Sequence, residues 1–318
     1  MFDHIVVVNG IPTEASDLGT TAEGSRVTPG LSPTTKEDLP LCHREPPRLI
    51  GPRAAYMDGP DFEYIAKDNV GLRPGGMFSP SGCKARHRVA IVIPYRNRMK
   101  HLRVLLHNLH PILGRQQLEY GIYVIDQALP GRFNRAMLMN IGFVEAMKRH
   151  DYQCFVFHDV DLIPEDDRNI YSCPQQPRHM SVAIDKYDYL LDYKAYFGGV
   201  SALSASHFSL INGCSNLYFG WGGEDDDMRQ RILAKGLNVT RYPMEIARYK
   251  MIKHTRDKHN EKNDERSTLL SNATQRMSYD GINTLVYTVN QVDKLPTHTR
   301  IEVLIDEHEV MKNYKQTI

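Results

Sequence analysis

Three short apolar runs, separated by two amphipathic segments, place the strongest limit on what this chain can fold into. Residues 89–93 (VAIVI) form a continuous apolar run that Pro94 ends, as is typical of a buried strand. Residues 99–113 and 133–150 have the apolar spacing of helices, whereas 120–127 and 153–164 have the composition of strands. The order strand, helix, strand, helix, strand predicts a parallel α/β sheet with crossover helices. Ligands of such sheets bind at the carboxyl ends of the strands.

The remaining segments are less regular. Residues 224–236 predict a helix that stops at Gly236, and residues 284–290 and 300–306 predict two antiparallel strands. Residues 1–47 are rich in Thr, Pro, Gly, Ser and charges and have no hydrophobic periodicity. We therefore expect a disordered or loosely packed lead-in over 1–47 and a single folded domain over 48–318.

The charge balance gives no general reason to expect nucleic acid or an acidic membrane surface as a partner. Lys and Arg number 39 against 38 Asp and Glu, so the formal net charge is +1. No apolar run approaches the roughly 20 residues of a membrane helix. No signal-peptide pattern is visible either. These observations favour either a cytosolic protein or one whose targeting segment is missing from this sequence.

Cysteine spacing leaves the redox compartment open. The five cysteines are Cys42, Cys83, Cys154, Cys173 and Cys214. None forms a CxxC pair, which argues against a zinc site built on thiolates. The spacing suits either disulfides in a secretory compartment or buried free thiols. Two potential glycosylation sites, Asn238 and Asn272, lean mildly towards the secretory route.

Paired carboxylates follow the third predicted strand. In the sequence HDVDL, strand alternation would put Asp159 and Asp161 on one side and Val160 on the other. Two such carboxylates can hold a divalent cation that bears a diphosphate. A polar strand end or a helix cap also explains an isolated DxD, and the motif taken alone favours that structural explanation over a metal site.

Arginines stand at the corresponding ends of other strands. Arg96 and Arg98 follow the first strand, and Phe133 and Arg135 precede the second helix. Arginine forks suit phosphates, and an aromatic ring can stack on a base. Surface arginines are the simple alternative for each site taken alone. Together with the paired acids, they indicate a nucleotide diphosphate bound with a metal.

The stretch FGWGGEDDDM holds the only Trp of the chain and four consecutive acids. Acids favour the first turn of a helix, so capping explains one or two of them. Four exceed that need, and Trp221 between glycines presents a mobile apolar face that suits a sugar ring. A carboxylate beside such a face could take a proton from a sugar hydroxyl. Further on, His254 lies in a long polar segment of the kind that forms lids and could be a metal ligand or a surface group.

Six segments, in this order, resemble the β-1,4-galactosyltransferase family of metal-dependent, inverting glycosyltransferases. They are IVIPYRNR, GRFNRA, FHDVDLIP, YFGGVSALS, WGGEDDD and MIKHTRDK, and the resemblance extends from about Leu41 to Asp306. It implies the GT-A fold: a mostly parallel, Rossmann-like sheet flanked by helices, with a small antiparallel part near the C-terminus. The implied reaction transfers galactose from UDP-galactose to the 4-hydroxyl of a terminal N-acetylglucosamine, or a related glucose-type acceptor, on glycoproteins or glycolipids.

The resemblance also implies roles for individual residues. Manganese would be held by Asp161, Met251 and His254, and Asp225 would be the catalytic base. Residues that match the UDP-galactose site are Arg96, Arg98, Phe133, Arg135, Asp159, Val160, Lys186, Tyr196 and Trp221. Residues that match the acceptor site are Glu224, Trp221, Tyr193, Arg266 and Leu270. Residues 252–270 would form a loop that closes over the bound donor and excludes water.

Tyr196 decides the expected donor. An aromatic residue here resembles galactose-transferring members, because its ring fills the space that a donor N-acetyl group needs. Transfer of N-acetylgalactosamine from UDP-GalNAc is the alternative, and a catalytically silent glycan-binding or regulatory homologue is another. Ser267 departs from the family pattern, which has an aromatic residue in the pocket for the acceptor N-acetyl group.

The resemblance further implies the disulfides Cys42–Cys83 and Cys154–Cys173, with Cys214 left free. It therefore implies residence in the Golgi lumen. Family members carry an N-terminal membrane anchor (a signal-anchor), which this sequence lacks, so we expect a soluble or truncated form or an incomplete gene model. The sequence does not identify a modifier subunit.

Overall fold

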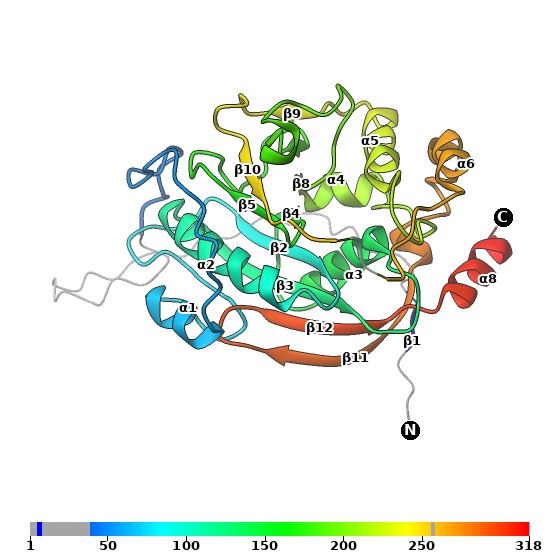
Figure 1. The fold of residues 1–318 in the computed structure, drawn as a ribbon, viewed down its shortest axis with the longest axis horizontal. Helices are drawn as coiled ribbons and strands as arrows, with labels where there is room; N and C mark the ends of the chain where they lie inside the picture. The colour runs from blue at the N-terminus through cyan, green and yellow to red at the C-terminus, as the bar shows by residue number, and fades with distance from the viewer. Residues whose placement is uncertain (1–4, 8–38, 256–257, 318) are drawn as a thin grey trace, which may run out of the picture.

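The computed structural model describes residues 5–7, 39–255 and 258–317. These residues build a nine-stranded sheet that runs through the centre of the molecule (Figure 1). In spatial order its strands are β1 (Ile5–Val7), β11 (Val286–Lys294), β12 (Thr299–Leu304), β3 (Glu119–Gln127), β2 (Arg88–Tyr95), β4 (Cys154–His158), β8 (Val200–Ser204), β6 (Arg178–His179) and β9 (Thr240–Arg241). A second, three-stranded sheet contains β5 (Leu162–Pro164), β10 (Arg248–Met251) and β7 (Ala183–Ile184).

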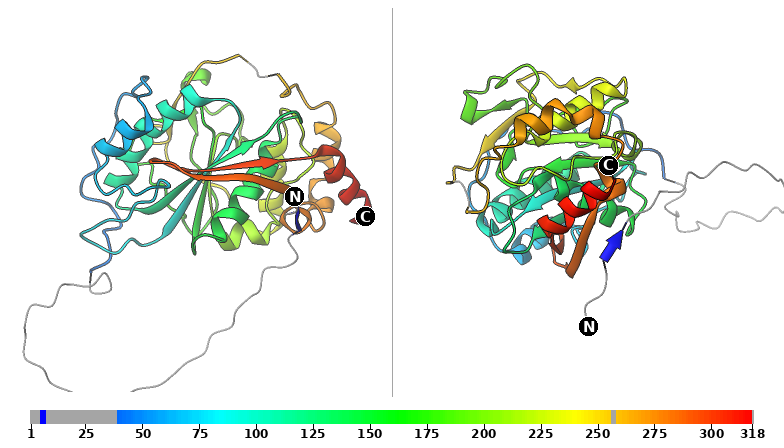
Figure 2. Two further views of the ribbon diagram at one scale, coloured as in Figure 1. Left: turned by 90° about the horizontal axis from the view of Figure 1, so that it is seen from below. Right: turned by 90° about the vertical axis from the view of Figure 1, so that its right-hand side faces the viewer.

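The centre of the large sheet is parallel, as the strand and helix order predicts. Strands β12, β3, β2 and β4 run parallel to one another. Antiparallel strands extend both flanks, β8 beside β4 and β11 beside β12. The two antiparallel strands predicted near the C-terminus are therefore β11 and β12, which lie side by side at one edge of the same sheet (Figure 2).

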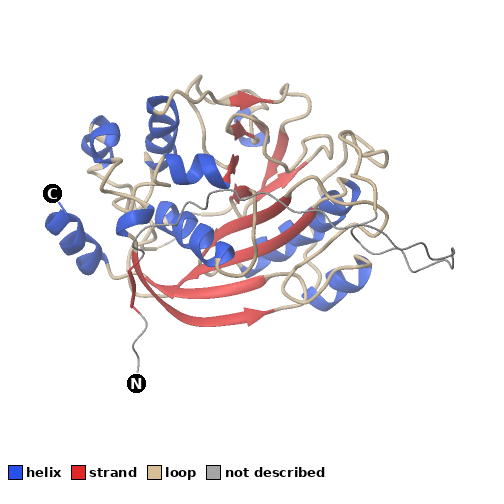
Figure 3. Ribbon diagram, turned by 180° about the vertical axis from the view of Figure 1, so that it is seen from behind, coloured by secondary structure: helices blue, strands red, loops and turns tan. Residues whose placement is uncertain are grey.

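Helices cover both faces of the sheet (Figure 3). Because successive strand residues point to opposite faces, β2 serves two cores. Val92 packs in the cluster with α3 (Arg135–Met147), and Ile91 packs in the cluster with α2 (Met99–Arg115). Gly142 allows α3 to approach closely, since a Cβ there would lie 2.2 Å from Val92 Cγ1.

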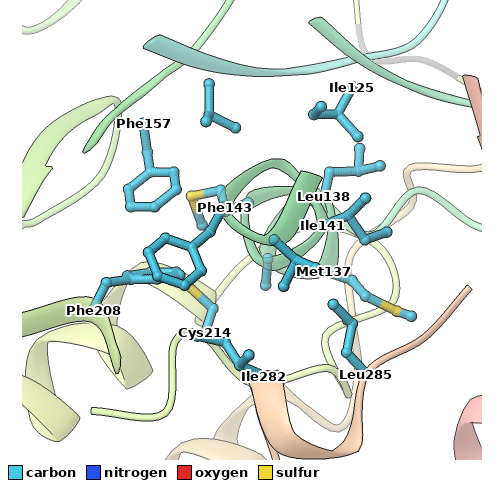
Figure 4. Close-up of a cluster of buried hydrophobic side chains, with 14 of the residues drawn as sticks. Ile125, Met137, Leu138, Ile141, Phe143, Phe157, Phe208, Cys214, Ile282 and Leu285 are labelled. Carbon is cyan, nitrogen blue, oxygen red and sulfur yellow. The ribbon is translucent and has the colours of Figure 1, made fainter. Parts of the chain in front are cut away.

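The core on the α3 side joins distant parts of the chain. Figure 4 shows α3 surrounded by side chains that include Phe157, Phe208, Cys214 and Leu285. Complete burial of each large apolar side chain contributes about 1.5–3 kcal/mol. The other helices are α1 (Phe62–Asp68), α4 (Ala205–Leu210), α5 (Glu224–Ala234), α6 (Arg266–Ser271), α7 (Ala273–Arg276) and α8 (Glu307–Thr317), with short 3₁₀ turns η2 (Asp185–Tyr187) and η3 (Ile282–Thr284). The helix predicted over 224–236 is α5.

The single strand predicted over 153–164 is wrong, because the chain turns within it. β4 ends at His158, and β5 begins at Leu162 in the other sheet. Asp159 N donates to Gly199 O at 3.2 Å, and Leu162 N lies 3.4 Å from Asp159 O. These bonds bend the backbone, so strand alternation does not orient Asp159 and Asp161.

Both disulfides implied by the resemblance are present. Cys42 is bonded to Cys83, and Cys154 to Cys173, whereas Cys214 is a buried free thiol. The lead-in predicted over 1–47 lies mostly outside the described residues. Within it, residues 5–7 form β1, which pairs antiparallel with β11. The division into 1–47 and 48–318 stays a prediction.

Candidate active site

The predicted site residues gather beyond the carboxyl ends of β2 and β4. Arg96 follows β2 and donates through Nη1 to Gly131 O at 2.8 Å. Its guanidinium carbon lies 5.0 Å from the centre of the Phe133 ring. Phe133 is itself held by His259, whose carbonyl accepts from Phe133 N at 2.8 Å. Two residues predicted to bind the donor nucleotide, Arg96 and Phe133, are therefore in contact.

The turn after β4 sends its two carboxylates to different partners. Asp159 Oδ1 accepts from Arg135 Nε at 2.6 Å, and Asp161 Oδ2 lies 2.9 Å from His254 Nε2. Val160 between them is half-buried and packs at the edge of the core on the α2 side. The pair does not share one ligand position, as alternation in a strand would require. Asp159 lies towards α3, and Asp161 lies towards the segment that follows β10.

The three residues predicted as metal ligands lie together. Met251, in β10, pairs with Leu162 of β5, so it stands beside Asp161. His254 follows three residues later and contacts Asp161, whose hydrogen bond raises the pKa of His254. Arg98 Nη2 lies 3.0 Å from the other ring nitrogen of His254. A carboxylate and an imidazole in contact suit a divalent transition ion, with a thioether as a weaker third ligand.

This set contains only two of the residue types that most often bind metals. Within the described parts of the chain, no group of three His, Cys, Asp or Glu side chains is arranged to hold an ion. The residues that are present nevertheless fit one, because the Asp161 carboxylate and the His254 ring meet at the surface rather than in the core. Their side chains are 15% and 30% exposed, which leaves them accessible to an ion.

Arg135 connects the donor side of the site to the acids of α5. Besides Asp159, its guanidinium faces Glu224 Oε1 at 3.7 Å and donates to Gly199 O at 3.2 Å. Glu224 Oε2 is buried and has no hydrogen-bond partner among the described residues. A buried carboxylate oxygen without a donor is costly, so this atom suits a ligand that brings a hydroxyl or N–H group.

Asp225 lies in the first turn of α5, where the sequence predicts the base. Burial, together with the neighbouring Glu224 and Asp226 charges, raises the pKa of Asp225 to about 7. Its Oδ2 packs on Gly198, since a Cβ at that position would lie only 2.5 Å from it. A carboxylate with a pKa near neutrality is suited to accept a proton from a hydroxyl group.

Residues predicted for the acceptor lie beside the start of α5. Tyr193 donates to Asp226 Oδ1 at 2.9 Å. Trp221 is 51% exposed, and the Arg266 guanidinium carbon lies 5.9 Å from its ring centre. Arg266 Nη1 is buried without a hydrogen-bond partner in the described structure. Leu270 is half-buried in α6.

The peptide group of Trp221 is held by the segment predicted to close over the donor. Trp221 N donates to Glu261 O at 2.8 Å, and Trp221 O accepts from Asn263 N at 3.0 Å. Gly220 N donates to Phe133 O at 2.8 Å. The acceptor-side loop, the donor-side Phe133 and the segment 259–263 therefore form one hydrogen-bonded unit.

Some predicted residues are not joined to this group. Lys186 is exposed on η2, and its Nζ lies 5.2 Å from the ring of the adjacent Tyr187. The neighbouring Asp185 is closer to the predicted metal residues, since its Oδ1 accepts from Met251 N at 2.7 Å. The two potential glycosylation sites, Asn238 and Asn272, are exposed, and their glycosylation stays a prediction.

Sequence reasoning misses two sets of residues that support the site. Asp227, Arg231, Arg276 and Asp280 form a buried ion network behind α5. Their spacing of four residues within each pair is a usable signal, although exposed helix pairs share it. Arg241 and His179 bond to the backbone around Tyr196. Neither belongs to a recognisable motif.

A cavity of about 590 Å³ lies away from this group, between the two disulfides at the amino-terminal edge of β2 and β4. Its lining includes Cys42, Arg86, Gln117, Cys173 and Arg178. None of the residues predicted to bind the donor, the acceptor or the metal contributes to it. The site at the opposite edge is therefore identified by side-chain chemistry rather than by the size of this cavity.

Comparisons with known proteins show which family the chain resembles over most of its length. The model of the N-terminal region of glycosyl transferase group 7 matches residues 42–174, and that of the N-terminal domain of galactosyltransferase matches 178–255. Beta-1,4-galactosyltransferase 1 of Mus musculus is 52% identical over 266 residues, which cover 83% of this chain and 67% of that protein. Its Homo sapiens counterpart is 50% identical over 271 residues, covering 85% and 68%.

Solved structures give the same answer for the fold. The catalytic domain of Drosophila β1,4-galactosyltransferase 7, in complex with xylobiose, superposes with a TM-score of 0.59 at 29% identity, covering 69% of this chain and 94% of that chain. A mutant of the same enzyme, solved with manganese, UDP-Gal and xylobiose, matches equally well. Within the described ranges, no helix combines the length and apolarity that crossing a membrane requires.

Proposed function

The chain belongs to the β-1,4-galactosyltransferase family, and we propose that it transfers galactose from UDP-galactose to the 4-hydroxyl of a terminal N-acetylglucosamine or related glucose-type acceptor. Relatives that are about half identical over most of the chain support this donor and linkage. The observation that carries the proposal is Asp225, a carboxylate whose pKa is raised to about 7 and whose Oδ2 lies against Gly198, next to the Tyr196 ring.

Asp225 is the proposed general base. The acceptor 4-oxygen forms a bond to the anomeric carbon of the donor while the bond from that carbon to the diphosphate breaks, which inverts the configuration. The hydroxyl proton passes to the Asp225 carboxylate, and UDP leaves with the bonding electron pair. Because Asp225 packs on Gly198, beside Tyr196, its carboxylate is held close to the residue proposed to contact the donor sugar.

The remaining residues bind and orient the two substrates. Arg96 and Phe133 suit the uridine nucleotide, because a cation and a stacking ring are already in contact. Arg135 is proposed to connect donor and acceptor sites through Asp159 and Glu224. The unpaired Glu224 Oε2 and Arg266 Nη1 provide one acceptor and one donor for acceptor-sugar groups.

A divalent cation is the proposed cofactor, and manganese is the ion named for the solved Drosophila relative. Asp161, Met251 and His254 are the residues that would hold it. When bound, such an ion neutralises the negative charge that develops on the diphosphate. Arg96 and Arg98 lie at the same end of the sheet and would orient the diphosphate for displacement.

A luminal Golgi location is the proposed setting. Support comes from family membership and from the two disulfides, which persist in oxidising compartments. Residues 48–318 are proposed as the catalytic domain.

A matrix of donors and acceptors tests the proposal. UDP-galactose and UDP-GalNAc are each incubated with N-acetylglucosamine, xylose and glucosylceramide, with manganese and with a chelator. We expect UDP-galactose and N-acetylglucosamine with manganese to give the highest kcat/KM, and the chelator to abolish transfer. Dominant use of UDP-GalNAc would refute the assignment of Tyr196. No product with any pair would favour a catalytically silent homologue.

A further inference from the structure

Two side chains outside every predicted motif hold the backbone that carries Tyr196. Arg241, on β9, donates through Nη2 to Lys194 O at 3.2 Å and to Tyr196 O at 2.7 Å. His179, on the adjacent β6, lies with Nε2 3.0 Å from Gly198 O. The strand register places His179 directly beside Arg241. Three alternate carbonyls of residues 194–198 are therefore bound by one pair of neighbouring side chains.

The hydrogen bonds of this pair have one consistent direction. Arg241 Nε donates to His179 Nδ1 at 3.2 Å, and a guanidinium has no acceptor atom. Nδ1 must then accept, so the ring proton lies on Nε2 and is donated to Gly198 O. His179 is fully buried, and burial with the nearby Arg241 charge lowers its pKa to about 3. The imidazole is thus a neutral connector that keeps this tautomer across the physiological pH range.

The backbone held in this way touches both the base and the donor-selecting ring. A Cβ at Gly198 would lie 2.5 Å from Asp225 Oδ2 and 2.8 Å from the Tyr196 ring. The His179 ring also meets the Tyr196 ring edge-on, with centres 5.2 Å apart. Ser181 Oγ adds a second bond to Gly198 O at 2.9 Å. A shift of residues 194–198 would therefore move Tyr196 and the surface on which Asp225 packs.

We propose that Arg241 and His179 are positioning residues that set donor choice, by holding Tyr196 where its ring excludes a donor N-acetyl group. The inference rests on the proposed galactosyl transfer. Steric exclusion requires a wall that does not move, because a pocket that relaxes by a small distance admits the larger sugar. Tyr196 has no strand or helix of its own. Tyr196 N donates to Tyr193 O at 2.9 Å within the loop, and the bonds from Arg241 and His179 to the carbonyls of residues 194–198 tie this loop to the sheet.

The test measures kcat/KM for UDP-galactose and UDP-GalNAc with N-acetylglucosamine in Arg241→Gln and Arg241→Lys. We expect the UDP-GalNAc to UDP-galactose ratio to rise about tenfold in Arg241→Gln, within the range that a few atoms in a pocket decide. A smaller rise is expected in Arg241→Lys, since an ammonium keeps the charge and loses the fork. Arg178→Lys is the matched control. Arg178 is half-buried on the neighbouring strand, donates to Ile170 O at 3.2 Å and should leave the ratio unchanged.

The same substitution made in a second variant distinguishes a role in positioning Tyr196 from a general loss of stability. In Tyr196→Ala, the substitution Arg241→Gln should have no further effect on the donor ratio, because the wall it positions is gone. An equal fall in kcat/KM for both donors, with an unchanged ratio, would overturn the positioning role and leave the proposed function intact. A wild-type enzyme that uses neither donor would instead refute the proposed function itself.

Discussion

Two aspartates in the first turn of α5 lie in opposite environments: Asp225 at the front of the helix, which faces the site, and Asp227 at its back, which faces the core. Asp225 faces the site, where burial and the acids beside it raise its pKa to about 7. Asp227, two residues later, is fully buried and accepts from Arg231 Nε at 2.6 Å, Arg276 Nη2 at 2.9 Å and Tyr218 Oη at 3.1 Å. The Asp225 carboxylate is poised to change its charge near neutral pH, whereas the Asp227 carboxylate is bound by two guanidinium groups and a phenol hydroxyl.

The network behind the helix continues beyond Asp227. Arg231 Nη2 also lies 3.2 Å from Asp280 Oδ2, Arg276 contacts the same carboxylate, and Ser215 Oγ donates to it at 2.6 Å. Two guanidinium groups thus balance two carboxylates in the core. A fully paired ion network anchors the helix, which allows an acid with little compensation to remain at its front.

The largest expected effect is the loss of activity on replacing Asp225, at the front of α5. Asp225→Asn removes the proposed base and retains the size of the side chain. We expect kcat to fall by about two to four orders of magnitude, the usual contribution of general base catalysis. UDP binding, measured by calorimetry, should stay within about twofold, because Arg96 and Phe133, the proposed contacts of the uridine nucleotide, lie on other segments of the chain. Turnover close to that of the wild type would refute the role of Asp225 as the base. The two aspartates would then differ in burial and partners but not in a catalytic role.

The same variant has a second consequence, for stability. The pKa of Asp225 is 3.8 before folding and about 7 in the folded protein, so the folded state binds more protons between these values. Stability is therefore lost as the pH rises towards 7. Asp225→Asn should unfold at a higher temperature than the wild type at pH 8, and the difference should shrink at pH 5.

The next largest effect is the loss of stability on replacing Asp227, at the back of α5. Asp227→Asn leaves Arg231 and Arg276 in the core with reduced compensation, so the free energy of unfolding should fall by about 3 kcal/mol. Denaturant titration at pH 8 measures it. Glu307→Gln is the control, because the Arg132–Glu307 pair is exposed and worth about 1 kcal/mol or less. Neighbouring Asp→Asn substitutions thus shift stability in opposite directions, and equal shifts would contradict the comparison.

The smallest effect is a pH dependence that belongs to the front alone. Because the base must be ionised, kcat/KM should fall about tenfold for each pH unit below 7. The residual activity of Asp225→Asn should lack this slope. A slope that persists in the variant would assign the titration to another group.

Part of this picture is predictable from sequence, for a physical reason. β2, β3 and the helices between and after them are recognisable because strands buried on both faces must be continuously apolar. The same reasoning fails after β4, since alternation assumes an unbroken strand and the backbone of Asp159 bonds to Gly199 instead. The sequence identifies Asp159 and Asp161 as candidate site residues. The turn after β4 determines which way their side chains point.

Supporting residues are harder to predict because nothing local marks them. Arg241 and His179 lie 62 residues apart in the chain, and only the sheet register brings them together. The four-residue spacing of Asp227 and Arg231 is visible in the sequence, but it fits an exposed helix surface equally well. Burial turns that ordinary pair into the anchor of the catalytic helix. Burial depends on the packing of α7, far along the chain.

The buried position of the one free thiol, Cys214, makes it a probe of local unfolding. Cys214 Sγ lies 3.4 Å from Met228 Sδ, in the packing between α3 and α5, and burial raises its pKa to about 12. Alkylating reagents need both access and the thiolate form, and the closed core denies them both. Modification must therefore wait until this region opens. The rate of Cys214 alkylation therefore reports how often the packing between α3 and α5 opens by local unfolding.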